Sequence, residues 1–392
     1  MVLKEGVYLC RIILPIKNTT GRLRNSFQRM SKKKKMLLLV LLPLLCIVII
    51  PAALFTYQIK TRIDQMIIPD TVFKELRFEL DTETDTSTSA EPYDQPVMQI
   101  ESSPTSKVKS SDDRYLLLMG LDYREGHDAL LTDTLMVMHI IPQESVIKLL
   151  SIPRDLMVTN RSGNKVKINS LFYEGYKLTQ QIAAYKPSIL TGDIVRVGRW
   201  DMDKAILGGA MANTRSKIES ILNVHIDHMI LANFDSVVSL VDAVGGIEVN
   251  VTRSMELSDV GLFLEPGLRT LDGNEALGYV RYRLDTRGSK YYISDFERVK
   301  NQQEIIKALA RKILSWNSAT KALAILDIIV DNIKTDLNYS AMYSMIKRFY
   351  GIFHPDSFVS IPFPEYYVPG GFVTIPDDEL DELRAQFQDL SS

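Results

Sequence analysis

Uninterrupted apolar runs and amphipathic segments alternate along the chain from residue 114 onward. Short apolar runs predict strands, whereas apolar residues that recur every three or four positions predict helices. We predict strands at 115–121, 134–141, 145–152, 228–234 and 247–251, and helices at 204–222 and 235–244, after the Asp272/Glu275 capping box, and from Asp295 onward. Alternation of this kind predicts a sheet that is covered on both faces by helices.

A different apolar pattern precedes this region. Residues 36–57 contain no charged side chain, and about 20 apolar residues suffice to cross a bilayer as a helix. The preceding 35 residues hold ten Lys/Arg and one acid, and such positive flanks stay cytoplasmic. The pattern favours an uncleaved signal anchor with the C-terminal part outside the cell. A cleaved signal peptide is the alternative, although the apolar run and its leading segment are both long for one.

Composition separates four predicted segments. Residues 1–35 form a basic cytoplasmic segment and 36–57 the membrane anchor. Residues 58–113 form a short helical stalk followed by a linker rich in Thr, Ser, Asp, Glu and Pro, which buries too little apolar surface to order itself. Residues 114–392 form the external folded domain.

Charge and cysteine usage narrow the class of protein. Lys+Arg 46 against Asp+Glu 48 gives no overall basic character, so nucleic acid is not an expected partner. The two cysteines, Cys10 and Cys46, lie before and within the apolar run, which leaves the external part without disulfides. A bacterial surface protein with a large core fits this pattern.

Two aspartates mark the first candidate site. Asp122 follows the first predicted strand, and Asp133 stands just before the second. Ligands of open α/β sheets bind at the carboxyl ends of strands, and paired carboxylates there suit Mg²⁺. The alternative is a pair of turn or capping aspartates.

Arg154, in the sequence SIPRD, follows the third predicted strand directly. Pro153 favours an extended approach to it, and the guanidinium fork pairs bidentately with phosphate or carboxylate. A local ion pair with Asp155 or another acid is the alternative. The KIN sequence at 167–169 adds a turn rich in hydrogen-bond donors.

The third candidate is EALGYVRYRLDTRGSKYYISDFERVKNQQ, residues 275–303. Arg281 and Arg283 share a face only if their segment is extended, whereas Asp295, Arg298 and Gln302 form one stripe of a helix. A solvated charged face is the alternative. A metal-bound pyrophosphate would bridge the acids and arginines of all three candidates, which is the usual layout for phosphoryl transfer.

These residues together resemble the LytR-CpsA-Psr family over about residues 114–385. The matching pieces, in the family's order, are LLLMGLDYR, TDTLMVMHI, KLLSIPRDLMV, KIN, VGGIEVNV, LDGNEALGYVRYR and DFERVKNQQ. The resemblance implies a three-layer α/β/α sandwich with a mixed central sheet, preceded by an N-terminal transmembrane helix. It also implies an apolar tunnel for a polyprenyl tail.

The resemblance implies a membrane-anchored phosphotransferase on the outer face of a bacterial, Gram-positive-type cell membrane. Such enzymes move an anionic glycopolymer, wall teichoic acid or capsular polysaccharide, from undecaprenyl pyrophosphate to an N-acetylmuramic acid of peptidoglycan. The matched positions are Asp122 and Asp133 for Mg²⁺, Arg154, Arg281, Arg283 and Arg298 for the pyrophosphate, and Asp295 for the acid of the DFxR element. Gln302 on the Arg298 stripe joins the predicted pyrophosphate site.

The chain departs from the family pattern at three places. Leu131 and Asn301 stand where the family usually has arginines, and residues 289–294 form an insertion. Arg124, Arg287 or Lys300 are candidates to replace the lost cations. These departures keep open a non-catalytic scaffold or regulator that binds lipid-linked polymer. The predicted external topology argues against a transcription attenuator.

Overall fold

The structure is a computed structural model. It describes residues 57, 59–69, 73 and 113–389, except for 123–129, 198–199, 259–260, 315–328, 330–331, 339, 343, 346–356 and 365. The chain from Arg62 onward forms one compact unit, which contains all of the elements below.

A six-stranded mixed sheet forms the centre of this unit, in the order β13-β8-β1-β2-β3-β14. β1–β8 and β3–β14 are parallel pairs, and the other neighbours are antiparallel. The strands are β1 Arg114–Asp122, β2 Leu131–Ile141, β3 Val146–Ile152, β8 His228–Asn233, β13 Ile333–Thr335 and β14 Phe358–Ile361. The predicted mixed sheet is thus confirmed, and so are its first three strands.

The central strands are apolar throughout because both faces of the sheet are buried. Leu117 and Val137 belong to the core on one face, whereas their neighbours Leu116 and Met136 belong to the core on the other. Side chains alternate between faces along a strand, so two buried faces require continuous apolar runs.

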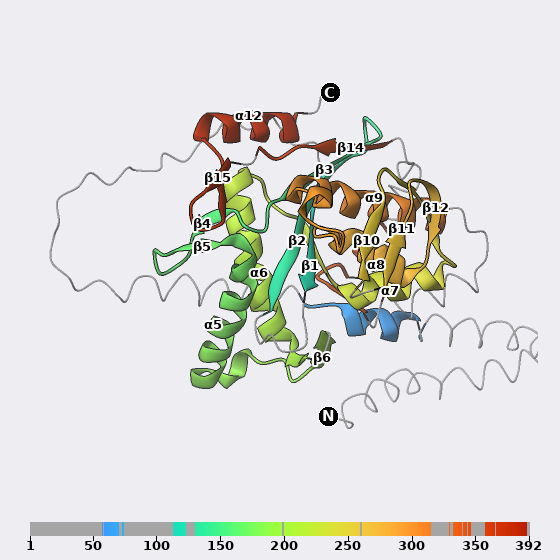
Figure 1. The fold of residues 1–392 in the computed structure, drawn as a ribbon. Coiled ribbons are helices and arrows are strands. Elements are labelled where there is room, and N and C mark those ends of the chain that lie inside the picture. Colours follow the sequence, from blue (N-terminus) through green and yellow to red (C-terminus); the bar gives the residue numbers. More distant parts are fainter. Residues whose placement is uncertain are drawn as a thin grey trace, which may run out of the picture. The chain divides into compact units, whose positions relative to one another are not determined.

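Helices cover the two faces of the sheet (Figure 1). α5 (Leu171–Tyr185) and α6 (Lys204–Leu222) share the Leu117 core with α12 (Asp377–Gln388), while α9 (Asp295–Leu314) packs through Ile306 on the Leu116 face. α7 (Phe234–Ala243) and α8 (Gly273–Arg281) form a further core with α9.

Local sequence explains several helix ends. The side chain of Asp203 accepts from the backbone N–H of Ala205 at the start of α6, and Asn223 ends it in a left-handed conformation with φ 52°. α8 begins with the predicted capping box of Asp272 and Glu275. The predicted helices at 204–222, 235–244, after Asp272 and from Asp295 are all confirmed to within about a residue.

Short strands complete the unit as two-stranded pairs. The pairs are β4 Met157–Thr159 with β5 Lys165–Lys167, β6 Ile194–Val197 with β7 Trp200–Asp203, β9 Ile247–Val251 with β12 Gly267–Leu271, β10 Met255–Leu257 with β11 Leu262–Leu264, and β15 Tyr366–Val368 with β16 Phe372–Thr374. Single 3₁₀ turns occur at η1 Ile168–Ser170, η2 Pro187–Ile189 and η4 Ser289–Tyr291.

The folded unit begins earlier than its predicted start at residue 114. Residues 59–66 are helical, and Ile67 forms a bridge with Thr335 on the edge strand β13. Ile68 is fully buried, and Phe73 is buried in the same core. The described part of the predicted stalk is therefore built into the domain, because its apolar side chains find a place against the sheet.

The predicted membrane anchor and most of the predicted linker lie outside the described residues. No helix within the described part of the chain is long and apolar enough to span a bilayer.

A buried lysine ties α12 to the sheet. Lys148 on β3 is fully buried, and its Nζ donates to the carbonyls of Gln386 at 2.9 Å and Asp389 at 2.6 Å. Burial lowers the pKa of this ammonium group, whereas the carbonyl oxygens at the end of α12 favour a cation.

Replacing Lys148 with alanine should lower the free energy of unfolding by about 2 kcal/mol, because it leaves these carbonyls unsatisfied. Urea denaturation at neutral pH measures the loss, and Lys165→Ala at an exposed position of β5 is the control. Equal stability of the two variants would contradict the anchoring role of Lys148.

Candidate functional site

A β-bulge places Asp133 at the edge of the central sheet. Gly120 pairs with Thr134 and Leu121 pairs with Thr132, so Asp133 is the extra residue between them. A Cβ atom on Gly120 would lie 2.9 Å from the Cβ of Thr134, which explains the need for glycine there. Bulges redirect a side chain out of the regular ladder, and this one places a carboxylate where β1 ends and β2 begins.

Asp133 and Arg154 come together directly, as their positions at neighbouring strand ends predict. Nη1 of Arg154 lies 2.7 Å from Oδ2 of Asp133, and both side chains are largely buried. Nδ2 of Asn169 donates to Oδ1 of Asp133 at 3.3 Å. The backbone N–H of Asn169 also donates to the carbonyl of Arg154, so η1 holds both partners.

The Arg154–Asp133 contact is the predicted alternative of an ion pair with another acid, and the local contact between Arg154 and Asp155 is the weaker of the two. Nε of Arg154 lies 3.7 Å from Oδ2 of Asp155, whereas Nζ of Lys167 lies 2.7 Å from Oδ1 of the same carboxylate. β16 packs behind this pair, since the backbone N–H of Val373 donates to the carbonyl of Asp155. Lys167 thus neutralises Asp155, and Arg154 is oriented toward Asp133.

Asp122 is the last residue of β1 and lies opposite Leu131 in the ladder, next to the bulge. Its side chain is outside the described part of the structure. Among described residues, no group of three or more His, Cys, Asp or Glu side chains could hold a metal ion. Asp133 supplies a carboxylate whose Oδ1 accepts a long contact from Asn169, and a carboxylate oxygen is the kind of ligand that Mg²⁺ prefers.

α9 brings the second group of predicted residues to the sheet. Arg298 and Gln302 are both 6% exposed, which confirms that their stripe faces inward rather than into solvent. Asp295 begins the helix, as predicted, but its side chain lies outside the described part. The solvated-face alternative is therefore wrong for Arg298 and Gln302.

The direction of α9 is fixed by two contacts with the sheet. Gln303 donates to Oγ of Ser151 near the end of β3 at 3.1 Å, whereas Ile306 packs farther back on the same sheet face. The helix therefore runs against β3, and its first turns, including Arg298, point toward the strand end that carries Arg154.

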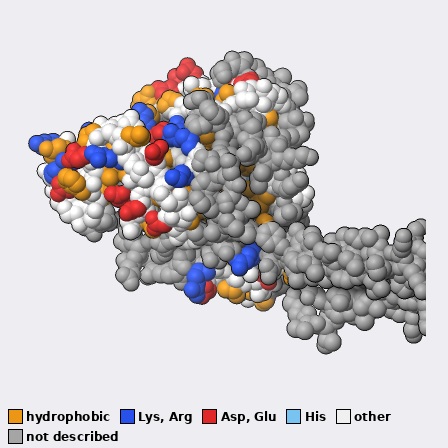
Figure 2. All heavy atoms as spheres, turned by 90° about the vertical axis from the view of Figure 1, so that its right-hand side faces the viewer, with side chains coloured by type: hydrophobic (Ala, Val, Ile, Leu, Met, Phe, Trp, Pro, Cys, Tyr) orange, Lys and Arg blue, Asp and Glu red, His pale blue; other side chains and the backbone are white. Residues whose placement is uncertain are grey.

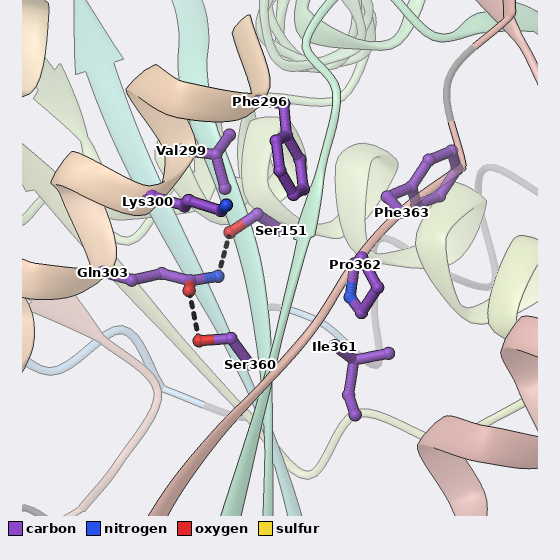
Figure 3. A pocket seen from close by; sticks show the side chains of 9 residues that line it. All are labelled: Ser151, Phe296, Val299, Lys300, Gln303, Ser360, Ile361, Pro362 and Phe363. Carbon is purple, nitrogen blue, oxygen red and sulfur yellow. Dashed lines mark hydrogen bonds between the residues drawn. The ribbon is translucent and has the colours of Figure 1, made fainter.

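An apolar cavity of about 220 Å³ lies between α9, β3 and β14 (Figure 3). Phe296 and Val299 line it from α9, and Pro362 and Phe363 line it from the segment after β14. Gln303 crosses its floor, since Oε1 also accepts from Oγ of Ser360 at 2.5 Å.

The cavity is mostly apolar and opens beside the turns that carry Arg298. Lys300 is at its rim, with Nζ 4.3 Å from the centre of the Phe296 ring.

Arg281 and Arg283 do not share an extended face. α8 continues through Arg281, and the chain leaves the helix at Tyr282, where ψ is 121°. Arg281 is half-buried and Arg283 is exposed, so the condition for a common face is not met. The nearby Tyr279 and Tyr282 are buried, and burial raises the pKa of each hydroxyl to about 12.

Asn301 has a structural role that accounts for the first missing arginine. Its side chain is buried, and Nδ2 donates to the carbonyl of Tyr279 at 3.3 Å. Asn301 thus satisfies a carbonyl in the last turn of α8 and supports the backbone that carries Arg281. The other departure, Leu131, is a half-buried residue at the start of β2, and nothing in the structure explains it.

Arg287 belongs to a separate ion-pair network. Its Nε and Nη2 bind the two carboxylate oxygens of Asp285 at 2.9 and 2.7 Å, and its guanidinium stacks 4.1 Å from the ring of Tyr291. Arg287 and the hydroxyl of Tyr282 hold the pKa of Asp285 well below its usual range. Arg287 therefore serves a salt bridge within the fold and is no replacement for a lost cation of the site.

The insertion at 289–294 completes this network. It forms η4, supplies Tyr291 beneath Arg287, and buries Ile293, whose backbone N–H donates to the carbonyl of Arg283 at 3.0 Å. Figure 2 views the molecule from the right-hand side of Figure 1. The Lys/Arg and Asp/Glu side chains on this face lie next to one another, and they do not form a patch of a single charge.

Three polar side chains around the candidate site were not singled out by sequence reasoning. These are Asn169, which orients Asp133, and the Ser151 and Ser360 hydroxyls that hold Gln303. The donor-rich KIN turn was the available signal for Asn169. The sequence gives no comparable signal for Ser151 and Ser360. These serines come close to Gln303 only because β3 and β14 pair in the sheet.

Comparisons with known proteins identify the family and the fold of the chain. The LytR_cpsA_psr family model matches residues 77–382. The polyisoprenyl-teichoic acid–peptidoglycan teichoic acid transferase TagU of Halalkalibacterium halodurans is 32% identical over 248 residues, which cover 62% of this chain and 67% of that protein.

Two solved structures share the fold. Bacillus subtilis TagV has 24% identity and a TM-score of 0.52, over 71% of this chain and 97% of that one. The structure of TagT bound to LIIa-WTA has 22% identity and a TM-score of 0.50, over 71% and 90%. With a family model that covers most of the sequence and a mixed α/β fold that matches its members, this chain belongs to the LytR_cpsA_psr family.

Proposed function

We propose that this protein is a membrane-anchored phosphotransferase that moves an anionic glycopolymer, such as wall teichoic acid or capsular polysaccharide, from undecaprenyl pyrophosphate onto peptidoglycan. The observation that carries the proposal is the Asp133–Arg154 pair at the end of β3, beside the turns of α9 that bury Arg298. The name of the TagU relative supports the substrate class.

The cations have distinct proposed roles in binding the donor. Arg154 is held in place by Asp133 and the η1 backbone, so its fork is oriented before a ligand arrives. Arg298 and Gln302 add buried donors from α9, and Arg281 and Arg283 add charge from the end of α8. Charge-assisted hydrogen bonds to phosphate are the strong ones, and orienting the donors in advance lowers the cost of binding.

Asp133 and Asp122 would hold Mg²⁺ at the bulge. Such an ion would draw electron density from the phosphate oxygens. It would also neutralise the negative charge that develops on these oxygens during transfer. The residues of the chain orient the donor around it: Arg154 lies on one side of Asp133, and Asn169 lies on the other. Bound phosphate would compete with Asp133 for Arg154, and this would release a carboxylate oxygen toward a cation.

The reaction is proposed as attack by the C6 hydroxyl of N-acetylmuramic acid on the sugar-linked phosphorus. A phosphodiester bond to the acceptor forms, the bond to the bridging oxygen breaks, and undecaprenyl phosphate leaves with that oxygen. The acceptor proton passes to a carboxylate, for which Asp295 and a carboxylate released from the metal are both candidates.

The apolar cavity beside Arg298 supports binding of the polyisoprenyl chain. Phe296, Val299 and Phe363 provide apolar walls next to the turns that carry the cations. A lipid pyrophosphate has this same division, with an apolar tail joined to an anionic head. The uncharged segment 36–57 and the basic residues before it support a single-pass anchor with this domain outside the cell.

A non-catalytic polymer-binding role is the second candidate. The absence of arginine at Leu131 and Asn301 favours it, because each position would otherwise add a charged donor. For Asn301 the structure offers another reason for the missing arginine, because the asparagine side chain supports the end of α8 that carries Arg281.

Transfer should depend on a divalent cation. We expect the full-length chain in detergent to release polyprenyl phosphate from a short-chain polyprenyl-pyrophosphoryl disaccharide and to link the sugar to a peptidoglycan oligomer with Mg²⁺. EDTA should lower the rate about 100-fold or more, because the phosphate charge then lacks its counter-ion. Mass spectrometry follows both products. Donor binding without product under any metal condition would favour the scaffold, and an equal rate in EDTA would exclude the metal.

A further inference from the structure

Three exposed apolar side chains lie at one end of the unit, on the end of α5 and the segment leading to β6. Tyr185 is 92% exposed, Leu190 39% and Ile194 64%. We name Tyr185, Leu190 and Ile194 the α5–β6 surface. Single exposed apolar residues are ordinary on soluble proteins, but several within one short segment mark a contact surface.

The segment is held rigidly, so these side chains cannot fold back into the core. Oδ1 of Asp203 accepts from the backbone N–H of Thr191 at 3.1 Å, and Oδ2 accepts from that of Gly192 at 2.7 Å. Gly192 has φ 75°, a conformation that glycine adopts readily. Leu190 and Ile194 therefore flank a fixed turn that points them outward.

The same turn is connected to the beginning of the folded unit. Nζ of the buried Lys204 donates to the carbonyl of Asp64 at 3.1 Å and lies 3.9 Å from Oδ2 of Asp193. Asp64 closely follows the uncharged segment that ends at residue 57, and residues 59–66 are helical. Only a few residues of the chain therefore separate the uncharged segment from the residue that Lys204 contacts.

The chemistry of the surface suits the interface of a bilayer. Tyrosine favours the headgroup level, aliphatic side chains favour the layer beneath it, and lysine attracts anionic lipid. Lys186 and Asp193 are the charged residues between positions 184 and 194, and Lys204 lies beside the carboxylate of Asp193. Little negative charge therefore opposes approach to an anionic membrane.

We propose that Tyr185, Leu190 and Ile194 rest in the headgroup region of the membrane into which the anchor inserts. This contact would fix the orientation of the domain relative to the bilayer that carries the lipid-linked donor. The inference rests on the proposed membrane anchoring and adds a second, peripheral contact to it. Two membrane contacts restrict a domain far more than a single flexible tether.

Site-specific fluorescence in vesicles tests this contact. In a full-length background with Cys10→Ser and Cys46→Ala, Ile194→Cys is labelled with an environment-sensitive dye. The matched control is Phe263→Cys, which replaces an apolar side chain that is also 61% exposed but lies on β11. In vesicles of anionic and zwitterionic phospholipid, we expect spin-labelled headgroups to quench the dye at 194 at least about threefold more than at 263.

Flotation of the same vesicles distinguishes a failure of the α5–β6 surface from a failure of the membrane anchor. A chain that floats but shows equal quenching at both positions would overturn the α5–β6 surface and leave the anchor and the transferase intact. A chain that does not float would overturn the anchor and the surface together. Polymer transfer measured in detergent reports on the proposed reaction independently of both outcomes.

Discussion

Replacing Arg154 with alanine should lower the rate of polymer transfer by about 100-fold or more, because it removes a pre-oriented donor of the proposed pyrophosphate site. Its Nη1 lies 2.7 Å from Asp133, and the backbone of Asn169 holds the turn that carries it. Arg154→Lys should retain part of the rate, since lysine keeps the charge but lacks the planar fork. The short-chain donor assay in detergent measures both variants.

Arg311→Ala is the matched control for this experiment. Arg311 lies in the last turn of α9, is 43% exposed, and makes an ion pair with Glu304 at 3.7 Å. It should transfer polymer at the unmodified rate. Circular dichroism confirms that Arg154→Ala still folds, and a normal transfer rate in that variant would remove Arg154 from the site.

The largest effect on stability is expected from Arg287→Ala. Asp285 has no exposed side-chain surface, and Arg287 provides two side-chain hydrogen bonds and one backbone hydrogen bond to it. Removing Arg287 leaves the buried carboxylate of Asp285 without its counter-ion, so the free energy of unfolding should fall. Urea denaturation at neutral pH should show this loss, whereas Arg253→Ala, which breaks an exposed pair with Glu297, should cost less than about 1 kcal/mol.

The same pair has a predictable dependence on pH. Because Arg287 depresses the pKa of Asp285, the stabilisation is complete above the unfolded value near about 4 and is lost as the pH falls toward the folded value. The difference in unfolding free energy between the unmodified chain and Arg287→Ala should therefore shrink in acid. A constant difference between neutral and strongly acidic pH would contradict this account.

Arg287 and Arg298 lie close together in the sequence but have different roles. Arg287 stabilises the fold, whereas Arg298 belongs, with Arg154, to the proposed donor site. Nothing in the spacing of positions 281–298 distinguishes these roles. The distinction comes from Asp285, which is buried against the insertion at 289–294 and accepts from Arg287 and Tyr282.

Local sequence was sufficient for several strands, several helices and some of their ends, whereas α5, α12, β13 and β14 were not predicted. Apolar runs predicted the first three strands of the central sheet, because both of its faces are buried, and the Asp272–Glu275 box predicted the start of α8. These features depend on residues close together in the chain. The resemblance to the family rested on the same kind of local motif, and the family model confirms it.

The start of the folded unit required the tertiary structure. Residues 58–113 resemble a stalk and a linker by composition, yet Ile67 pairs with Thr335 and Ile68 is fully buried. Apolar residues mixed with charged ones in a short segment give a weak signal by themselves. Its burial depends on an edge strand more than 250 residues later in the sequence.

The sequence by itself determined the family, several of the strands and helices, and the positions of Asp133 and Arg154 near strand ends. The tertiary structure decided which charged groups meet. The bulge directs Asp133 toward Arg154, α9 carries Arg298 with its side chain buried, and Asn301 supports α8. Secondary structure follows from neighbours in the chain, whereas the partner of a charged side chain depends on how distant elements pack together.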